Sequence, residues 1–314
     1  MTAQGPRQGR LALVLGGGGT LGVVQAAYIQ AAFELGFRPD IVIGTSVGAL
    51  NGAWVAMYPD DPQGLLDVWR GLGRIRVLRW NPLHLAARVT RNPRALRDND
   101  IVRGLIDAHV RDLRFEDARL ELAVVATNLT RGRKHLFREG PLAPAIAAST
   151  AIPGVFEPVE LAGELYVDGC ITASVDIASA LALGATEVLA IDLTPPAGAA
   201  APPKTALGVL AQSFRILSRA TTEAMEAIGR SAAAVQVVRP DLAGLSPWRL
   251  DVAEPLIQEQ LAQARCRLTR VLDPWGRVAG GGNRETGGGK REAGDGNRET
   301  GGGNRETGER RHAA

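Results

Sequence analysis

Residues 11–33, LALVLGGGGTLGVVQAAYIQAAF, place four consecutive glycines between an apolar run and an alanine-rich helical pattern. The run at 11–15 predicts a buried strand, and the pattern at 21–35 predicts a helix. A glycine-rich corner between a strand and a helix can point backbone N–H groups at an anion. That anion is either a bound phosphate or an oxyanion that exists only during a reaction.

The residues that follow do not complete either phosphate-binding motif. Gly17, Gly19 and Gly22 match the dinucleotide fingerprint G-x-G-x-x-G, which also needs an acidic residue near the end of the second strand. That strand, predicted at 40–43, has its only nearby acid at its first residue. A P-loop needs a lysine after the glycines, and this chain has Gly-Val-Val at 22–24. A nucleotide site is therefore disfavoured.

The second predicted strand leads directly into GTSVG at residues 44–48, which fits the motif G-x-S-x-G. In that motif Gly44 and Gly48 flank a serine on a sharp strand-to-helix turn, because the strained backbone leaves little room for side chains. Ser46 would then lie at the N-terminus of a helix, where negative charge is favoured. A purely structural turn is the alternative. The position between an apolar strand and a helix favours a serine nucleophile.

A serine nucleophile needs a base. Only one histidine follows the later acidic residues, as an α/β-hydrolase would require, and it lies in the C-terminal tail. The four histidines are His84, His109, His135 and His312. We therefore expect a base other than histidine. Asp168, in LYVDGC, follows an apolar strand and precedes a glycine that allows a neighbouring backbone to approach closely. Its carboxylate can accept the serine proton directly, and an Asp-Gly β-turn is the alternative.

Short apolar runs alternate with helical patterns over residues 10–275, which predicts one α/β layered domain. Residues 1–9 are predicted to be a flexible N-terminus. From 276 to 314 the chain is rich in Gly, Arg and Glu and contains a seven-residue repeat. No position of the repeat is apolar, so it cannot form a coiled coil, and we expect a disordered, inert tail.

Composition narrows the class of protein. Of the 314 residues, 45% are hydrophobic and 22% charged, which is typical of a soluble globular protein. The net charge of +3 is spread along the chain, so we expect no nucleic-acid partner. The two cysteines, Cys170 and Cys266, suit a reducing compartment. Since the sequence shows neither a secretory signal nor an 18-residue apolar stretch, we expect a cytoplasmic protein.

An arginine-rich stretch at 74–97 carries seven arginines and no acidic residue. Leucines and Trp80 lie among these charges. Two interpretations are equally weighted. The stretch binds an anionic membrane surface peripherally, or it is a solvated face from which Trp80 packs inward. Sedimentation with neutral and anionic vesicles would separate them.

Five motifs occur in order between residues 11 and 195: LVLGGGGTLG, IGTSVGALNGA, ATNLTRG, AASTAIPGVFEPV and YVDGC. Together they resemble the patatin-like phospholipases. The resemblance implies a three-layer α/β sandwich whose mostly parallel central sheet is flanked by helices. It also implies a dyad of Ser46 and Asp168, with an oxyanion hole made by the amides of Gly17, Gly18 and Gly19. The family cleaves acyl esters of lipids through an acyl-enzyme and then water, and no cofactor or metal is implied.

The chain departs from the family pattern at two positions. Leu21 stands where relatives usually carry arginine or lysine, and Cys170 stands where they usually carry glycine or alanine. The backbone donors survive both changes. Two alternatives to hydrolysis stay open. The same dyad can transfer the acyl group to another acceptor in place of water. In the second alternative, Leu21 and Cys170 mark a degenerate, non-catalytic lipid-binding module.

Overall fold

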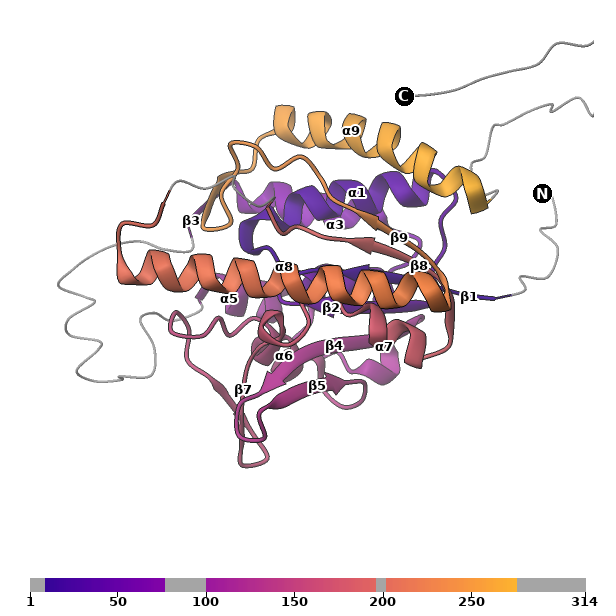
Figure 1. The fold of residues 1–314 in the computed structure, drawn as a ribbon. Coiled ribbons are helices and arrows are strands. Elements are labelled where there is room, and N and C mark those ends of the chain that lie inside the picture. The colour runs from indigo at the N-terminus through magenta and orange to yellow at the C-terminus, as the bar shows by residue number, and fades with distance from the viewer. Residues whose placement is uncertain (1–8, 77–99, 196–201, 276–314) are drawn as a thin grey trace, which may run out of the picture. The chain divides into compact units, whose positions relative to one another are not determined.

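The computed structural model describes residues 9–76, 100–195 and 202–275, which all belong to one compact unit of the chain (Figure 1). The N-terminal segment predicted to be flexible, 1–9, is therefore described only at its last residue. The tail at 276–314, predicted to be disordered, lies outside the described residues. So does the arginine-rich stretch at 74–97, apart from its first three residues.

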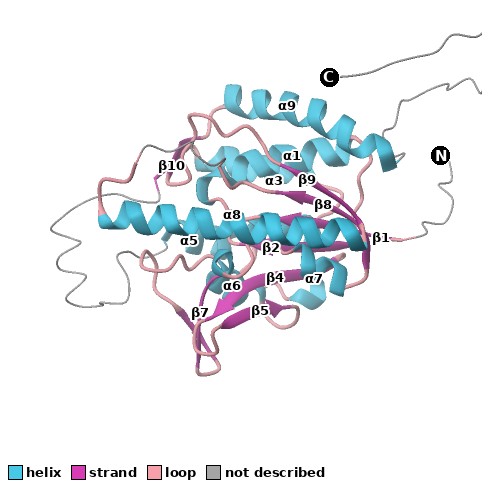
Figure 2. Cartoon of the chain, in the orientation of Figure 1, coloured by secondary structure: helices cyan, strands magenta, loops and turns pink. Residues whose placement is uncertain are grey.

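Strands and helices alternate along the described residues (Figure 2). The strands are β1 (Arg10–Leu15), β2 (Ile41–Thr45), β3 (Arg74–Arg76), β4 (Glu121–Asn128), β5 (Arg133–Phe137), β6 (Val159–Leu161), β7 (Glu164–Asp168), β8 (Ala185–Ile191), β9 (Ala234–Val238) and β10 (Arg249–Asp251). The helices are α1 (Gly22–Glu34), α2 (Val47–Met57), α3 (Pro62–Leu72), α5 (Asp100–His109), α6 (Leu142–Ser149), α7 (Ile177–Ala182), α8 (Ala206–Ala232) and α9 (Glu254–Leu272). The 3-10 turns η1 (Gly19–Leu21) and η3 (Gly169–Ile171) follow the glycine run and β7.

The central sheet of the described chain has eight strands in the order β6-β7-β4-β2-β1-β8-β9, with β5 also paired to β4. The strands from β4 to β9 in this order are parallel, whereas β5, β6 and β7 are antiparallel to their neighbours. β1 and β2 are adjacent, with Leu15 opposite Gly44. Parallel neighbours end at the same edge of a sheet, so the glycine run and GTSVG leave the sheet side by side.

The side chains of β1 alternate between two hydrophobic cores, one on each face of the sheet. Leu11, Leu13 and Leu15 pack with residues of α1, α3 and α9, while Ala12 and Val14 pack with residues of α7 and α8. A strand that is buried on both faces is apolar throughout, which explains the run LALVL. Helices therefore cover both faces of a mostly parallel sheet (Figure 1), and the expected three-layer α/β fold is confirmed.

Local signals account for several element boundaries. Asp61 accepts a 2.8 Å hydrogen bond from the Gly64 amide at the start of α3, where Pro62 is the first helical residue. Thr205 caps α8 in the same way, at 3.0 Å from the Gly208 amide. No helix in the described ranges is long and apolar enough to cross a bilayer.

Candidate active site

Ser46 lies on a strained turn between β2 and α2. Its backbone angles, φ 57° and ψ −124°, fall in a region that residues other than glycine rarely adopt. A Cβ atom at Gly44 would lie 2.3 Å from the carbonyl oxygen of Gly48, and one at Gly48 would lie 2.2 Å from that of Leu15. Both contacts are with backbone, which cannot move aside. The turn therefore depends on glycine at both flanking positions.

The hydroxyl of Ser149, at the end of α6, holds this turn in place. The Ser46 amide donates a 2.8 Å hydrogen bond to the Ser149 hydroxyl oxygen. The Ser149 hydroxyl in turn donates to the carbonyl of Val125 on β4, at 2.6 Å. Ser149 is fully buried, so the loss of its hydroxyl would leave two buried backbone groups without a partner. Sequence reasoning did not single out Ser149, although it lies within AASTAIPGVFEPV.

Asp168 is the last residue of β7 and caps the turn η3. One carboxyl oxygen accepts a 2.9 Å hydrogen bond from the Cys170 amide. The Asp168 amide donates to the Ala151 carbonyl at 2.9 Å. A Cβ at Gly169 would lie 2.4 Å from the Val125 carbonyl oxygen, so this glycine allows β4 to approach. Asp168 is therefore followed by glycine because β4 passes too close for any side chain at residue 169.

The side chain of Ser46 lies close enough to Asp168 to lower the pKa of its carboxyl. Only 6% of Ser46 and 3% of Asp168 is exposed. Burial raises the pKa of Asp168 above its ordinary value, because the charged carboxylate is poorly solvated. The hydrogen bond from the Cys170 amide, together with the side chains of Ser46 and Cys170, lowers the pKa and partly offsets this effect. The fold thus places a serine hydroxyl beside a carboxyl group with increased proton affinity.

The glycine run lies against the same turn. A Cβ at Gly17 would lie 3.1 Å from the Ser46 Cβ and 2.3 Å from the Cys170 Sγ, so no larger residue fits there. Gly18 packs against the side chain of Leu193. Gly19 has φ +58°, and a Cβ there would lie 2.3 Å from the Pro247 carbonyl oxygen. Close approach, and at Gly19 backbone conformation as well, therefore explains why the run contains consecutive glycines.

The loop is fixed at both of its ends and leaves amides available in between. The Gly16 amide donates to the Ile191 carbonyl and the Thr20 amide to the Pro247 carbonyl, both at 3.0 Å. No acceptor among the described residues receives a hydrogen bond from the amide of Gly17 or Gly18. Amides held in place without an acceptor can bind an anion.

A buried chain of polar side chains supports the loop from below. The side-chain amide of Gln25 donates a 3.0 Å hydrogen bond to the Gly16 carbonyl. The side-chain amide of Asn51 donates to the Gln25 side-chain oxygen at 2.9 Å and to the Gly22 carbonyl at 3.0 Å. The indole N–H of Trp69 completes the chain with a 3.0 Å hydrogen bond to Asn51. Sequence reasoning missed this network, because only the fold brings α1, α2 and α3 together.

The two departures from the family pattern have different surroundings. Leu21 is fully buried in the hydrophobic core. The Cys170 sulfur lies against Gly17 and accepts a 3.7 Å hydrogen bond from the Ser174 hydroxyl. Burial raises the pKa of the Cys170 thiol well above its ordinary value, and the nearby Asp168 carboxylate adds to this effect. The thiol is therefore a neutral neighbour of the Ser46–Asp168 pair.

The histidines that the structure describes contact aromatic rings. His109, at the end of α5, lies with its ring centroid 5.9 Å from that of Trp54. His135 lies 4.3 Å from Phe137, and burial lowers its pKa. His135 and Asp168 both pair with Ala126 of β4, from different strands, so two strand spacings of roughly 5 Å each separate them. His84 and His312 lie outside the described residues.

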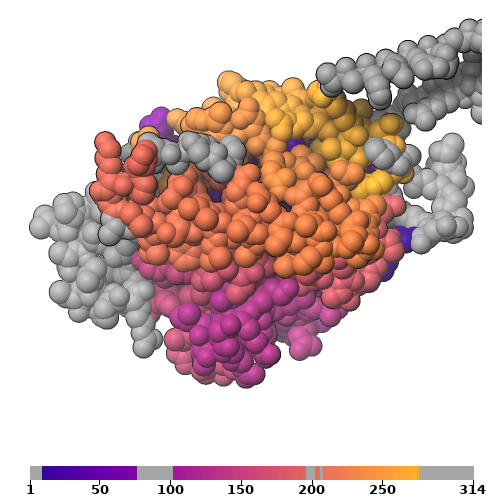
Figure 3. Space-filling model, in the orientation of Figure 1, coloured from indigo at the N-terminus to yellow at the C-terminus, as the bar shows by residue number. Residues whose placement is uncertain are grey.

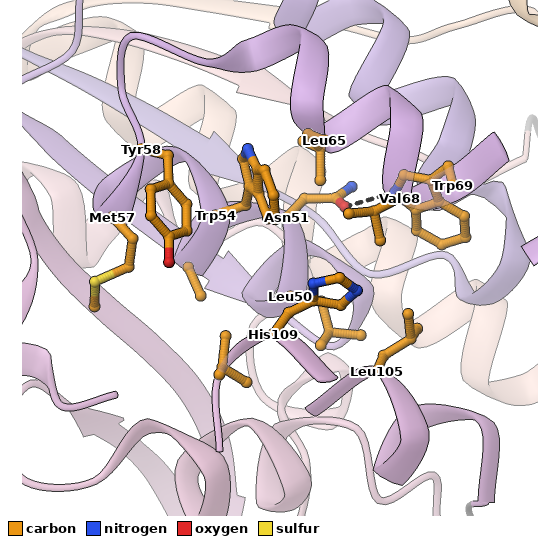
Figure 4. A pocket seen from close by; sticks show the side chains of 12 residues that line it. Leu50, Asn51, Trp54, Met57, Tyr58, Leu65, Val68, Trp69, Leu105 and His109 are labelled. Atoms are coloured by element: carbon orange, nitrogen blue, oxygen red, sulfur yellow. Dashed lines mark hydrogen bonds between the residues drawn. The ribbon is translucent and has the colours of Figure 1, made fainter. Parts of the chain in front are cut away.

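A small apolar pocket lies between α2, α3 and α5, beginning one helical turn beyond Ser46 (Figure 4). Leu50, Trp54, Leu65 and Leu105 are among its lining residues, and Trp69 is hydrogen-bonded to Asn51 at its edge. Its volume is about 30 Å³, far below the several hundred Å³ of a typical ligand pocket. It is too small for an acyl chain. No group of three His, Cys, Asp or Glu residues in the described ranges is arranged to hold a metal ion.

Known proteins resemble this chain in sequence and in structure. An uncharacterized NTE-family protein of Mycobacterium tuberculosis is 33% identical over 198 residues, which are 62% of this chain and 51% of that protein. The lysophospholipase nte1 of Aspergillus terreus is 29% identical over 181 residues, 58% of this chain and 12% of that protein. The chain thus spans about half the length of its mycobacterial relatives. VipD from Legionella pneumophila superposes with a TM-score of 0.47 and 14% identity, over 85% of this chain and 67% of VipD.

The family model for patatin-like phospholipases matches residues 13–181. The matched segment begins in β1 and ends in α7, and so includes the glycine run, Ser46, Ser149 and Asp168. The chain belongs to the patatin-like phospholipase family.

Proposed function

We propose that this protein hydrolyses acyl esters of lipids, with Ser46 as the nucleophile and Asp168 as the base. The observation that carries the proposal is that Ser46, on its strained turn, lies beside the buried carboxyl of Asp168 and lowers its pKa. Membership of the patatin-like phospholipase family, with a relative named lysophospholipase, supports a lipid ester as the substrate.

In the acylation step, the Ser46 Oγ attacks the ester carbonyl carbon while its proton passes to the Asp168 carboxylate. The carbonyl oxygen becomes an oxyanion, and the amides of Gly17, Gly18 and Gly19 are proposed to donate to it. Collapse of this intermediate breaks the ester C–O bond, and Asp168 returns the proton to the departing alcohol. The products are the free alcohol and an acyl group on Ser46.

Two features favour proton transfer to an aspartate. Burial raises the pKa of Asp168, which brings its proton affinity closer to that of the serine. In this proposal the N-terminus of α2, and the glycine-run amides that have no acceptor among the described residues, stabilise the charge that develops on the substrate. Loss of one such donor typically raises a barrier by about 3–4 kcal/mol.

In the deacylation step, water gives a proton to Asp168 and attacks the acyl carbon, and the acid leaves as Ser46 recovers its proton. An alcohol or thiol acceptor in place of water would make the same dyad an acyltransferase. A second candidate, a non-catalytic lipid-binding module, rests on the Cys170 sulfur, which lies 2.3 Å from where a Cβ on Gly17 would be.

Labelling with a fluorophosphonate tests the proposal. The wild-type protein should form a stoichiometric adduct, located at Ser46 by peptide mass spectrometry, and Ser46→Ala should form none. Wild-type protein should also release fatty acid from lysophospholipid, and Ser46→Ala and Asp168→Asn should not. A folded wild-type protein that is neither labelled nor active would favour the non-catalytic module. Activity retained by either variant would refute the dyad.

A further inference from the structure

The inner side of α8 carries buried polar residues beside Met225, which packs against the core. Ser218, Thr222 and Glu226, spaced four residues apart, are all buried. The Ser218 hydroxyl donates a 3.2 Å hydrogen bond to the Cys170 carbonyl in η3. Glu226 forms an ion pair with Arg239, at 2.7 Å, next to β9. Polar contacts therefore hold α8 against the domain.

The opposite side of α8 is apolar and exposed. Seven large hydrophobic side chains are classed as exposed among the described residues, and five of them are on α8. Between 42% and 60% of each of the five is exposed: Val209, Leu210, Ile216, Leu217 and Ile228. Val209 and Ile216, like Leu210 and Leu217, are seven residues apart, so they share one face of the helix. In Figure 3 the orange atoms of α8 extend across the face of the molecule turned to the viewer.

The first part of α8 and the residues before it carry basic charges only. Between Asp192 and Glu223 the sequence contains no acidic residue, whereas it contains Lys204, Arg215 and Arg219. The acidic residues of α8 itself, Glu223 and Glu226, follow this segment and are paired with arginines. The end of α8 that carries four of the five exposed apolar residues is therefore basic. An amphipathic helix with apolar residues on one side and basic residues beside them is typical of a helix that lies in a membrane interface.

The inner side of α8 packs next to the candidate active site. Ser218 contacts the η3 loop that begins after Asp168, and the side chain of Leu210 comes within 3.9 Å of a Cβ placed on Gly154. A surface that contacts the apolar face would thus lie on the outer side of the helix whose inner side contacts the loop after Asp168.

We propose that α8 docks on the surface of an anionic lipid bilayer. Val209, Leu210, Ile216 and Leu217 enter the boundary between headgroups and acyl chains, while Lys204 and Arg215 lie at the anionic headgroups. This binding goes beyond the proposed function and does not require Ser46 to react. It assigns membrane contact to a different surface from the arginine-rich stretch at 74–97.

Vesicle sedimentation of the full chain tests the proposal. The vesicles contain phosphatidylcholine alone or phosphatidylcholine mixed with phosphatidylglycerol. The wild type should partition onto the mixed vesicles, and less so at high salt. The double variant Ile216→Gln/Leu217→Gln should partition at least about tenfold less, because it removes two apolar anchors. Lys204→Gln/Arg215→Gln should weaken binding to the mixed vesicles only.

Leu129→Gln is the matched control, since Leu129 is 52% exposed on a turn after β4 and lies outside α8. It should bind like the wild type. Failure of the wild type to bind, or equal binding by Ile216→Gln/Leu217→Gln, would overturn the proposal. So would a wild-type dimer in light scattering that this variant dissociates without any vesicle binding, because the face would then join two copies of the chain.

Ser46→Ala separates this inference from the proposed function. It should sediment with mixed vesicles as the wild type does and release no fatty acid. If the wild type binds vesicles but is neither labelled nor active, the docking surface stands and the proposed hydrolysis fails. If it is labelled at Ser46 and hydrolyses a soluble ester but does not bind vesicles, the hydrolysis stands and the docking surface fails.

Discussion

The amide of Ser46 and the hydroxyl of Ser149 are joined by a 2.8 Å hydrogen bond, although the two residues belong to different helix–strand units. Ser149→Ala should therefore affect both stability and catalysis. It leaves the Ser46 amide and the Val125 carbonyl without their buried partner, which costs roughly 1–3 kcal/mol in unfolding free energy. A loosened turn should lower kcat by roughly tenfold to a hundredfold.

Urea unfolding and hydrolysis assays measure the two effects. Thr150→Val is the matched control, because the Thr150 hydroxyl donates only to carbonyls of its own helix. The control should keep its kcat. Equal kcat values for Ser149→Ala and Thr150→Val would contradict a role for Ser149 in holding Ser46.

Asp168→Asn should raise the melting temperature at neutral pH while it removes activity. The folded state raises the pKa of Asp168, so the folded protein binds more protons than the unfolded chain between the ordinary and the raised pKa. Stability from this group is thus lost as pH rises through that window. The asparagine of the variant carries no charge at any pH, so the variant does not lose this stability as pH rises. Melting curves from pH 4 to 8 should show the advantage of Asp168→Asn growing with pH, and an advantage independent of pH would argue against it.

The pH dependence of kcat/KM should show an acid limb governed by Asp168. Only the carboxylate can accept the serine proton, so activity falls as pH decreases through the raised pKa. The neighbouring Cys170 thiol lowers that pKa, with a smaller effect than burial has in raising it. Cys170→Ala should therefore shift the acid limb to higher pH, and Cys170→Ser should shift it less. An acid limb that is identical in Cys170→Ala and the wild type would show that the thiol does not act on Asp168.

The two cysteines should differ in reactivity. Cys170 is half-buried and its pKa is raised well above its ordinary value, so its thiolate is scarce, whereas Cys266 is exposed on α9. Iodoacetamide at pH 8 should modify Cys266 first in the folded protein and both residues in urea. Peptide mass spectrometry against time measures this order, with Cys266 as the internal reference. Equal rates in the folded protein would contradict the burial of Cys170.

Two glycine-to-alanine variants should change stability in opposite directions. One introduces a steric clash at the Ser46 turn, and the other only improves helix propensity. Gly48→Ala places a Cβ 2.2 Å from a backbone carbonyl, and we expect a loss of about 4 kcal/mol or more, or failure to fold. Gly71→Ala in α3 has no neighbour within 4 Å and should gain about 0.5–1 kcal/mol. Urea unfolding measures both. A Gly48→Ala variant within about 1 kcal/mol of wild type would mean that the turn has more room than described.

Much of the fold could be predicted, because elements buried on both faces are uniformly apolar. The strand predicted at 11–15 is β1, Arg10–Leu15, and the helix predicted at 21–35 is α1, Gly22–Glu34. The antiparallel strand β6 was not predicted. Its three residues are only partly buried, and its two-residue connection to β7 has positive φ at both Ala162 and Gly163, which an alanine does not signal.

The candidate site was predictable only in part. Motifs placed Ser46 and Asp168, because their chemistry demands particular neighbours in sequence. Ser149, Gln25 and Asn51 act through hydrogen bonds to residues from distant elements, and no local pattern specifies those partners. The orientation of α8 was equally inaccessible. A 27-residue amphipathic pattern ordinarily turns its apolar side to the core, whereas α8 leaves five large apolar side chains exposed.

The two proposed catalytic residues rest on parts of the sheet that differ in how firmly they are held. Ser46 follows β2, which is paired on both sides in the parallel centre, whereas the β7 strand that ends at Asp168 pairs with β4 through three residues. Suppose the β6–β7 hairpin separates from β4 while the rest stays intact. That molecule would keep its parallel strands, its cores and its far-ultraviolet spectrum, but its serine would have no carboxylate. Inactivation on heating would then begin at one edge of the sheet, before the fold itself is lost.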